Sequence, residues 1–389
     1  MKQGMKKQLV LSATVGGIFL FAPVVLAAEE QNAPTVEEVT GSNQVSSETS
    51  TLSEVATSQG IPTVTASSSE NTATGQTSET RLLAMTDDQA SQETKELYAY
   101  LKDLNKKKDI LFGQQHALDE GVTLTSEGSR AGSTDSDVKN AVGDYPAVFG
   151  WDTLSLDGYE KPGVSGDPKQ SIANLTHSMK TAHQLGGIIT MSTHPHNFVT
   201  GGDFNDTSGN VVQEILPGGS KNNQFNQWLD RIAELAHNLK TDEGKTIPVI
   251  FRPFHEQTGS WFWWGESTTN PEQYKALYRY TVEYLRDQKG VHNFLYAYSP
   301  GAGNDRYFKT YPGDAYVDVL GIDSYDDKNQ PGSDSYIQAL KKDTTMLVKE
   351  AEARNKIAAL TEFGYSAQGL KNTGNTLDWY TRIFNALQK

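Results

Sequence analysis

Residues 248–256 read Pro-Val-Ile-Phe-Arg-Pro-Phe-His-Glu, an apolar run that ends in ionisable side chains. An apolar run without polar alternation is typical of a parallel strand that is buried on both faces. Arg252, His255 and Glu256 would then lie at or just beyond the carboxyl end of that strand. The segment predicts a buried parallel strand with an acidic side chain at its end.

Six further apolar runs follow the same pattern, and amphipathic stretches separate them. The runs lie at 110–112, 147–151, 187–191, 294–298, 317–322 and 357–360, and stretches with helical spacing lie at 172–185, 225–239, 270–285 and 336–352. Asn270 and Pro271 are suited to the N-cap and first position of a helix. The alternation predicts an α/β fold, specifically a (β/α)8 TIM barrel. A doubly wound open sheet is less compatible, because no glycine-rich phosphate loop follows the first run.

The predicted barrel is one strand short. After the seventh run only one helix-like segment, 377–387, remains before the chain ends. Seven strands would leave two open edges in a fold that normally closes. We therefore expect a barrel that lacks its eighth strand because the chain is truncated at its C-terminus. Two alternatives are an early strand that the pattern does not reveal and a partner that fills the gap.

The first residues have the features of a secretory signal. Three lysines among the first seven residues precede an apolar stretch over 9–26, and Ala27 is a small residue of the kind that signal peptidase reads. This pattern predicts a signal peptide over 1–27. An uncleaved membrane anchor is the alternative, which the glycines at 16–17 and Pro23 disfavour. Either interpretation places the rest of the chain outside the cytoplasm, and the signal peptide predicts a secreted protein that could be associated with the cell wall.

Composition limits what the rest of the chain can be. Residues 28–85 are rich in Ser, Thr and Glu and predict a disordered linker, which leaves 86–389 as the barrel domain. The net charge of −14 argues against a nucleic-acid partner and against an anionic membrane surface. The chain has no cysteine, which excludes disulfides and thiolate chemistry. No cofactor, metal or obligate protein partner is inferred.

Barrel enzymes place their active sites at the carboxyl ends of the strands, so polar residues there are the first candidates. In chain order these residues are Gln114, Gln115, His116, Asp152, His194, His196, His255, Glu256, Asp323, Tyr325 and Glu362. The fourth and seventh strands, which would end near Glu256 and Glu362, face each other across a barrel. Two carboxylates on either side of a glycosidic bond can hydrolyse it, and in retaining enzymes they stand about 5–5.5 Å apart. The alternative is that each glutamate forms a structural ion pair, for example with Arg252.

Three tryptophans follow Glu256 within the stretch Gly-Ser-Trp-Phe-Trp-Trp-Gly at 259–265. Large indole rings are costly to expose, so they either stack on sugar faces or fill the core. We expect at least Trp261 to face a sugar and one of the other two to be structural.

The motifs at 252–256 and 259–265 resemble those of glycoside hydrolase family 26, whose best-known members are endo-β-1,4-mannanases. Thr-Glu-Phe-Gly at 361–364 and Gly-Ile-Asp-Ser-Tyr at 321–325 match the same family, and the resemblance extends from about Lys95 to the C-terminus. It implies a secreted retaining enzyme that cleaves β-1,4-mannan or galactomannan by double displacement. The polysaccharide is the only partner that the resemblance implies.

The resemblance also implies roles for individual residues. Glu256 would be the acid/base and Glu362 the nucleophile, with Tyr325 donating a hydrogen bond to it. His255 would shape the surroundings of the acid, and Trp261 would stack beside the cleaved bond. The remaining expected substrate-binding or supporting residues are His116, Arg252, Trp264, Asp323 and His194, which stands where mannanases carry a Trp-His pair that contacts the sugar.

Some positions depart from the family pattern. Gln257 and Thr258 replace a frequent Met-Asn, Thr193 precedes His194 in place of Trp, and Phe198 replaces a proline. These departures leave the identity of the sugar undetermined, and xylan or mixed-linkage β-glucan is an alternative substrate. Strand alternation would also send His255 and Glu256 to opposite sides, so a bend is needed for both to line the cleft.

Two rival functions remain. The His-Pro-His at 194–196 could bind a metal, although such barrel sites need further histidines on later strands, and none follows the fifth or sixth run here. A non-catalytic polysaccharide-binding barrel is the second rival, because a missing strand could abolish turnover.

Overall fold

The computed structural model describes residues 20–21, 85–107, 109–124, 130–326, 333–365 and 378–388. The predicted signal peptide, apart from Leu20 and Phe21, and the predicted linker, apart from Met85, lie outside the described residues. Within the described residues, no helix combines the length and apolar character needed to cross a bilayer.

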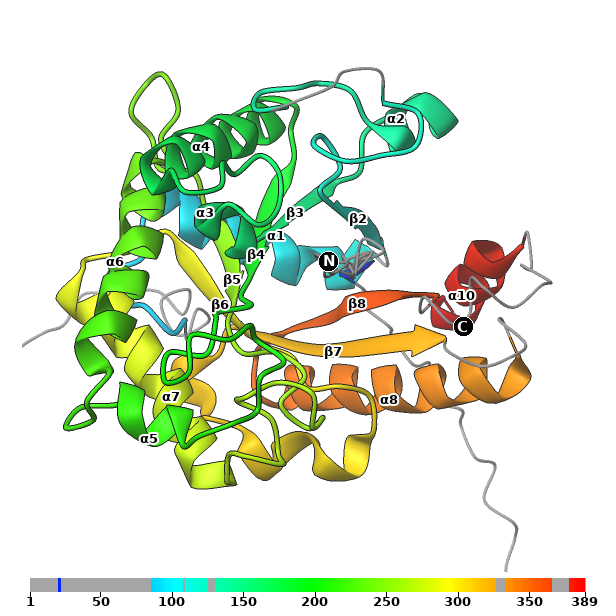
Figure 1. The fold of residues 1–389 in the computed structure, drawn as a ribbon. Helices are drawn as coiled ribbons and strands as arrows, with labels where there is room; N and C mark the ends of the chain where they lie inside the picture. Colours follow the sequence, from blue (N-terminus) through cyan, green and yellow to red (C-terminus); the bar gives the residue numbers. More distant parts are fainter. Residues whose placement is uncertain are drawn as a thin grey trace, which may run out of the picture. The chain divides into compact units, whose positions relative to one another are not determined.

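Seven parallel strands, in sequential order, form the centre of the molecule (Figure 1). They are β2 (Leu111–Gln115), β3 (Val148–Asp152), β4 (Ile188–Ser192), β5 (Val249–Arg252), β6 (Phe294–Tyr298), β7 (Val319–Asp326) and β8 (Ile357–Tyr365). Each strand coincides with one of the seven apolar runs and pairs in parallel with the next. The prediction of a (β/α)8-type barrel with seven parallel strands is confirmed.

The position between β8 and β2 is taken by a short antiparallel strand, β1 (Leu20–Phe21). Leu20 pairs with Phe112 of β2 and with Leu360 of β8. The described residues hold no eighth parallel strand. The sequence did not predict β1, because its two residues lie within the apolar stretch interpreted as a signal peptide. The predicted truncation of the chain stays a prediction.

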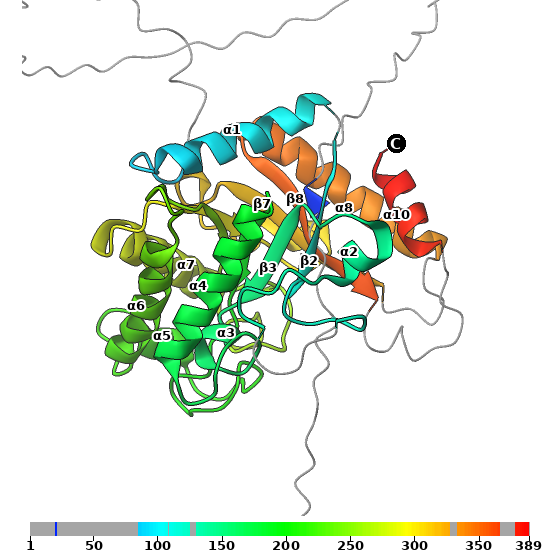
Figure 2. The same cartoon turned by 90° about the horizontal axis from the view of Figure 1, so that it is seen from above.

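Helices and helical turns surround the sheet on its outside and at its amino end (Figure 1 and Figure 2). They are α1 (Gln92–Lys107), α2 (Asp137–Val142), α3 (Leu154–Asp157), α4 (Pro168–Gln184), α5 (Val211–Ile215), α6 (Asn222–Asn238), α7 (Pro271–Glu283), α8 (Asp334–Ala353) and α10 (Trp379–Leu387), with a π-helical turn η1 (Tyr284–Gln288) and 3₁₀ turns η2 (Asn304–Thr310) and η3 (Asp314–Tyr316). Asn270 caps α7 in a reciprocal capping box with Gln273, and Pro271 occupies the first turn.

Helix α1 closes the amino end of the barrel (Figure 2). Its buried residues Tyr98, Leu101 and Leu104 belong to one apolar cluster with residues near the starts of five strands, which are Val148, Ile250, Leu295, Val319 and Ile357. The larger apolar cluster lies between the sheet and the outer helices. The carboxyl ends of the strands are left for the polar residues that the sequence places there.

Candidate active site

The chain bends sharply just after β5, and this bend turns both His255 and Glu256 toward the site. Phe254 and Glu256 have φ values of 52° and 55°, in the left-handed region that non-glycine residues rarely adopt. Two left-handed residues around His255 break the strand alternation that would otherwise send the two side chains apart. The bend that the sequence required is therefore made by local backbone strain.

Partners from distant parts of the chain hold this bend. The Phe254 N–H donates to Thr193 Oγ1 at 3.0 Å, and the Phe254 carbonyl accepts from the Tyr274 hydroxyl at 2.8 Å. The Glu256 N–H donates to the carbonyl of Ser299 at 2.9 Å. Strained residues persist only where surrounding contacts over-determine them, and these three hydrogen bonds do so here.

Glu362 lies on β8, directly opposite this bend. Its Oε2 accepts from the Tyr325 hydroxyl at 2.8 Å, and its Oε1 accepts from Arg252 Nη2. His255 Nε2 lies 3.7 Å from the same Oε1. A shift in the pairing of β7 with β8 after Ile322 brings Asp323 level with Glu362. The strand irregularity thus gathers side chains from β5, β7 and β8 around one carboxylate.

Arg252 connects these strands. It is 1% exposed, and its Nη1 donates to Asp323 Oδ2 at 2.9 Å and to Ser299 Oγ at 3.0 Å. Burial alone would lower the pKa of the guanidinium, but the charges of Asp323 and Glu362 outweigh it and raise that pKa. The side chain is a permanent cation held between two carboxyl groups from different strands, and its hydrogen bond orients Glu362.

Glu256 has the opposite environment. Its Oε2 accepts from Trp261 Nε1 at 2.9 Å. Burial, and after it the negative charge of Glu362, raise the pKa of Glu256 to about 7. Near neutral pH a carboxyl group in this state can donate a proton, whereas the ion-paired Glu362 is an acceptor. The two glutamates therefore lie in different electrostatic surroundings.

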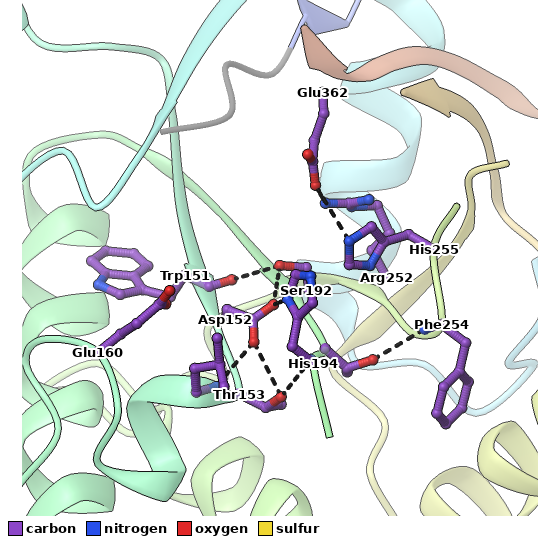
Figure 3. A network of polar contacts seen from close by, with 12 residues as sticks. Trp151, Asp152, Thr153, Glu160, Ser192, His194, Arg252, Phe254, His255 and Glu362 are labelled. Carbon is purple, nitrogen blue, oxygen red and sulfur yellow. Dashed lines mark hydrogen bonds and ion pairs between the residues drawn. The ribbon is translucent and has the colours of Figure 1, made fainter. Parts of the chain in front are cut away.

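The pKa values of two histidines beside these glutamates are shifted in opposite directions. His194 Nδ1 lies 2.8 Å from Asp152 Oδ2 (Figure 3). Burial would lower the pKa of His194, but the charge of Asp152 outweighs it and raises that pKa. Burial holds the pKa of His255 well below its usual value, and the positive charges of Arg252 and His194 lower it further. Two imidazoles whose pKa values are shifted in opposite directions thus lie edge to face, with centroids 4.5 Å apart.

The three tryptophans have separate roles. Trp261 is 49% exposed beside Glu256, so its ring is free to receive a substrate. Trp263 and Trp264 are buried and cross at 88°, and their Nε1 atoms donate to the carbonyls of Pro195 and His255 at 2.9 and 2.8 Å. Trp264 is therefore a supporting residue that fixes the backbone of the bend, and it does not present a face to the cleft.

The two remaining histidines that the sequence singled out, His116 and His196, lie apart from His194 and His255. His116, at the end of β2, is buried with Nε2 2.8 Å from Glu160 Oε2. His196 packs on Phe198 with centroids 4.4 Å apart, and burial lowers its pKa. Among the described residues, the group spaced to hold a metal is His255, Asp323 and Glu362, which includes neither His194 nor His196. Arg252 already supplies a cation to both carboxylates of that group.

Sequence reasoning missed several residues that complete the site. Thr193 appeared only as a departure from a family tryptophan, yet it anchors the bend. Glu160 lies in a loop with no strand end to mark it, and its charge acts on both His116 and His194. Phe204, in the loop after β4, packs on His194 at 4.8 Å. The first had a usable signal, a polar residue at a strand end, whereas the other two had none.

Comparisons with known proteins fit this geometry. The family model "Glycosyl hydrolase family 26" matches residues 86–389. A mannan endo-1,4-β-mannosidase of Bifidobacterium adolescentis is 45% identical over 309 residues, which is 78% of this chain and 30% of that protein. The catalytic domain of a GH26 endo-β-1,4-mannanase from Bacillus sp. JAMB-750 is 57% identical, with a TM-score of 0.75 and 78% of each chain covered. A modular endo-β-1,4-mannanase of Cellulomonas fimi is 46% identical, with a TM-score of 0.73 and with 79% of this chain and 67% of that chain covered. The chain thus spans less than a third of the length of the Bifidobacterium relative.

Proposed function

The chain belongs to glycosyl hydrolase family 26, and from this premise we propose that it is a retaining endo-β-1,4-mannanase acting on mannan or galactomannan. The observation that carries the proposal is the opposed state of two carboxyl groups. Burial and a neighbouring charge raise the pKa of Glu256 to about 7, while Arg252 and Tyr325 hold Glu362 as a hydrogen-bonded carboxylate. Retaining hydrolysis needs one of each.

In the first step a carboxylate oxygen of Glu362 attacks the anomeric carbon. The bond from that carbon to the glycosidic oxygen breaks, and Glu256 gives its proton to the departing oxygen. The products are a sugar chain with a free hydroxyl and a glycosyl ester on Glu362. Arg252 and Tyr325 direct the lone pairs of Glu362 through their two hydrogen bonds.

In the second step Glu256 acts as a base. Esterification removes the charge of Glu362, which had raised the pKa of Glu256. The pKa of Glu256 therefore falls, and its carboxylate remains ionised. It takes a proton from water while the water oxygen attacks the anomeric carbon and the ester bond breaks. Glu362 leaves as a carboxylate and Glu256 is protonated again. The charge coupling between the two glutamates thus drives the exchange of roles.

Three further observations support a mannan substrate and action outside the cell. Trp261 offers a half-exposed ring hydrogen-bonded to the acid, which suits stacking against a sugar beside the cleaved bond. The names of the relatives favour a β-1,4-mannan. A polymer of this kind is met outside the cell, in agreement with the signal peptide expected over residues 1–27.

A substrate panel tests the proposal. Wild type, Glu256→Ala and Glu272→Gln are assayed for reducing-sugar release on mannan, galactomannan, xylan and lichenan. We expect mannan or galactomannan to be the best substrate and Glu256→Ala to lower kcat by about 100- to 10,000-fold, the share of a general acid/base. Glu272 is an exposed carboxylate on α7, so its variant controls for loss of charge alone.

The outcomes separate the alternatives. Preference for xylan or lichenan would keep the mechanism and reassign the sugar. Binding without release of reducing ends in the wild type would identify a non-catalytic polysaccharide-binding barrel. Products with inverted anomeric configuration, followed by NMR, would contradict the role of Glu362 as a nucleophile.

A further inference from the structure

Asp152 is a buried carboxylate at the end of β3 that contacts neither catalytic glutamate. Its Oδ2 accepts from Ser192 Oγ at 2.5 Å and faces His194 Nδ1 at 2.8 Å. Its Oδ1 accepts from the Leu154 N–H at 3.0 Å and from Thr153 Oγ1 at 3.3 Å. Figure 3 shows this carboxylate at the centre of the contacts among β3, β4 and His194. Four donors fix both of its oxygens, so its direction toward His194 does not vary.

His194 is held from several sides. Its side chain is 16% exposed, against 3% for that of Asp152. Phe262 packs on the ring edge at 5.2 Å and His255 at 4.5 Å, and the His194 N–H donates to Thr153 Oγ1 at 3.2 Å. An ionised carboxylate only accepts hydrogen bonds, so Nδ1 must carry a proton. Within the described chain no hydrogen bond engages the second ring nitrogen, which therefore belongs to the exposed part of the site.

We propose that Asp152 is a positioning residue for hydrolysis, which holds the His194 ring by its Nδ1–H and so sets the charge and direction of this imidazole beside Glu256 and Glu362. The inference rests on the proposed function, because it assigns a role within that reaction. It extends the site from the residues that face the cleft to a carboxylate behind them. Carboxylates behind functional histidines fix the ring and its protonation in the same way in other enzymes.

The charged groups around His194 determine in which direction the pH profile should shift when Asp152 loses its charge. Asp152 on β3, Glu160 in the following loop and Glu362 on β8 favour its protonated form. The protonated ring in turn lowers the pKa of Glu256 and of His255. Without the charge of Asp152, His194 loses its proton more readily. Glu256 then loses a positive neighbour, so the alkaline limb of kcat moves to higher pH while the sugar contact weakens.

A double-mutant cycle on the full chain tests the proposal, with kcat, KM and the pH profile measured on the best mannan substrate. Asp152→Asn keeps the shape and removes the charge. We expect it to lower kcat/KM by about 10- to 100-fold, a magnitude taken from the loss of carboxylates behind metal-ligating histidines. In a His194→Gln background the same change should lower kcat/KM by less than about twofold, because the imidazole through which Asp152 acts is already absent.

Asp119→Asn is the matched control. Asp119 is also buried and accepts from Trp151 Nε1 at 2.6 Å and from Ser178 Oγ at 3.1 Å, and none of its hydrogen bonds involves His194. Its effect should add fully to that of His194→Gln, and it should leave the alkaline limb in place. An Asp152→Asn effect that is equally additive, or that leaves the alkaline limb unmoved, would overturn the proposal.

A second measurement needs no variant to fold. ¹⁵N chemical shifts of the wild-type histidines should show a protonated Nδ1 on His194 at neutral pH. An unprotonated Nδ1 would contradict the proposal. A wild type that hydrolyses no polysaccharide overturns the proposed function, whereas hydrolysis with an additive cycle overturns the role of Asp152 alone.

Discussion

The proton of Glu256 depends on a neighbour across the barrel, because the charge of Glu362 is one cause of its raised pKa. Glu362→Gln removes that charge and should lower the pKa of Glu256 below about 7. Trp261 donates to Glu256, so its fluorescence reports the titration. Glu272→Gln on the outer face of α7 should leave the midpoint unchanged. A midpoint that stays near 7 in Glu362→Gln would assign the whole shift to burial.

The same raised pKa has a consequence for stability. The folded-state pKa of Glu256 lies above its unfolded value of 4.5, so its contribution to stability is fullest below pH 4.5 and is lost as pH rises through about 7. Glu256→Gln removes a group that is unfavourable when charged. We expect its Tm to exceed that of the wild type by a few degrees at pH 8, with the gain shrinking toward pH 4.5. A gain that is independent of pH would mean that the ionised state is not the cause.

At the scale of elements, one of the three hydrogen bonds that hold the bend after β5 goes to the hydroxyl of Thr193, the residue that follows β4. Thr193→Val keeps the shape of the side chain and leaves the Phe254 N–H without its acceptor. We expect a loss of about 1–3 kcal/mol in unfolding free energy. A fall in kcat should accompany it, because Glu256 loses its fixed backbone. Urea unfolding and mannan hydrolysis check the two effects.

Thr190→Val provides the control for that variant. Thr190 is also buried on β4, and its hydroxyl donates to the Ile250 carbonyl at 3.0 Å within the sheet. Its loss should lower stability without lowering kcat. A parallel fall of kcat in both variants would show that the Thr193 effect is general weakening of the sheet.

The elements also show how far a sequence can predict structure. All seven parallel strands were predicted, because each contains a short, mostly apolar run without polar alternation. Helix α5 was missed, since it lies in the glycine- and asparagine-rich stretch 201–220. The need for a bend at His255 followed from strand alternation. Its form did not, because the residues that fix it are 20 to 61 positions away along the chain.

The candidate site was predictable where barrel geometry determines it. Carboxyl ends of parallel strands converge, so Glu256, Glu362 and Tyr325 could be placed together from their strands alone. Side chains whose direction depends on packing could not be placed. His196 is two residues from His194, yet it packs on Phe198 near Asp157 and Arg231. Glu160 reaches His116 from a loop, where no period constrains direction.

At the scale of the whole domain, the barrel has one end for packing and one for chemistry. Leu101→Ala removes buried apolar volume where α1 covers the amino ends of the strands. We expect a loss of about 2–5 kcal/mol in unfolding free energy. kcat at a permissive temperature should be nearly unchanged, because the site lies at the other end. Tyr100→Ala, on the exposed face of the same helix, should change neither quantity. A kcat that falls with Leu101→Ala would show that the two ends are coupled.

The left-handed backbone at Glu256 has an evolutionary consequence. A glycine adopts φ near 55° without the penalty of about 1–2 kcal/mol that a side chain incurs there. Natural selection for turnover therefore keeps a glutamate where selection for stability alone would install glycine. Descendants freed from the need to hydrolyse should drift to glycine at this position early. On the proposed function, a Glu256→Gly variant should bind mannan without cleaving it and would serve as an inert probe for that polymer.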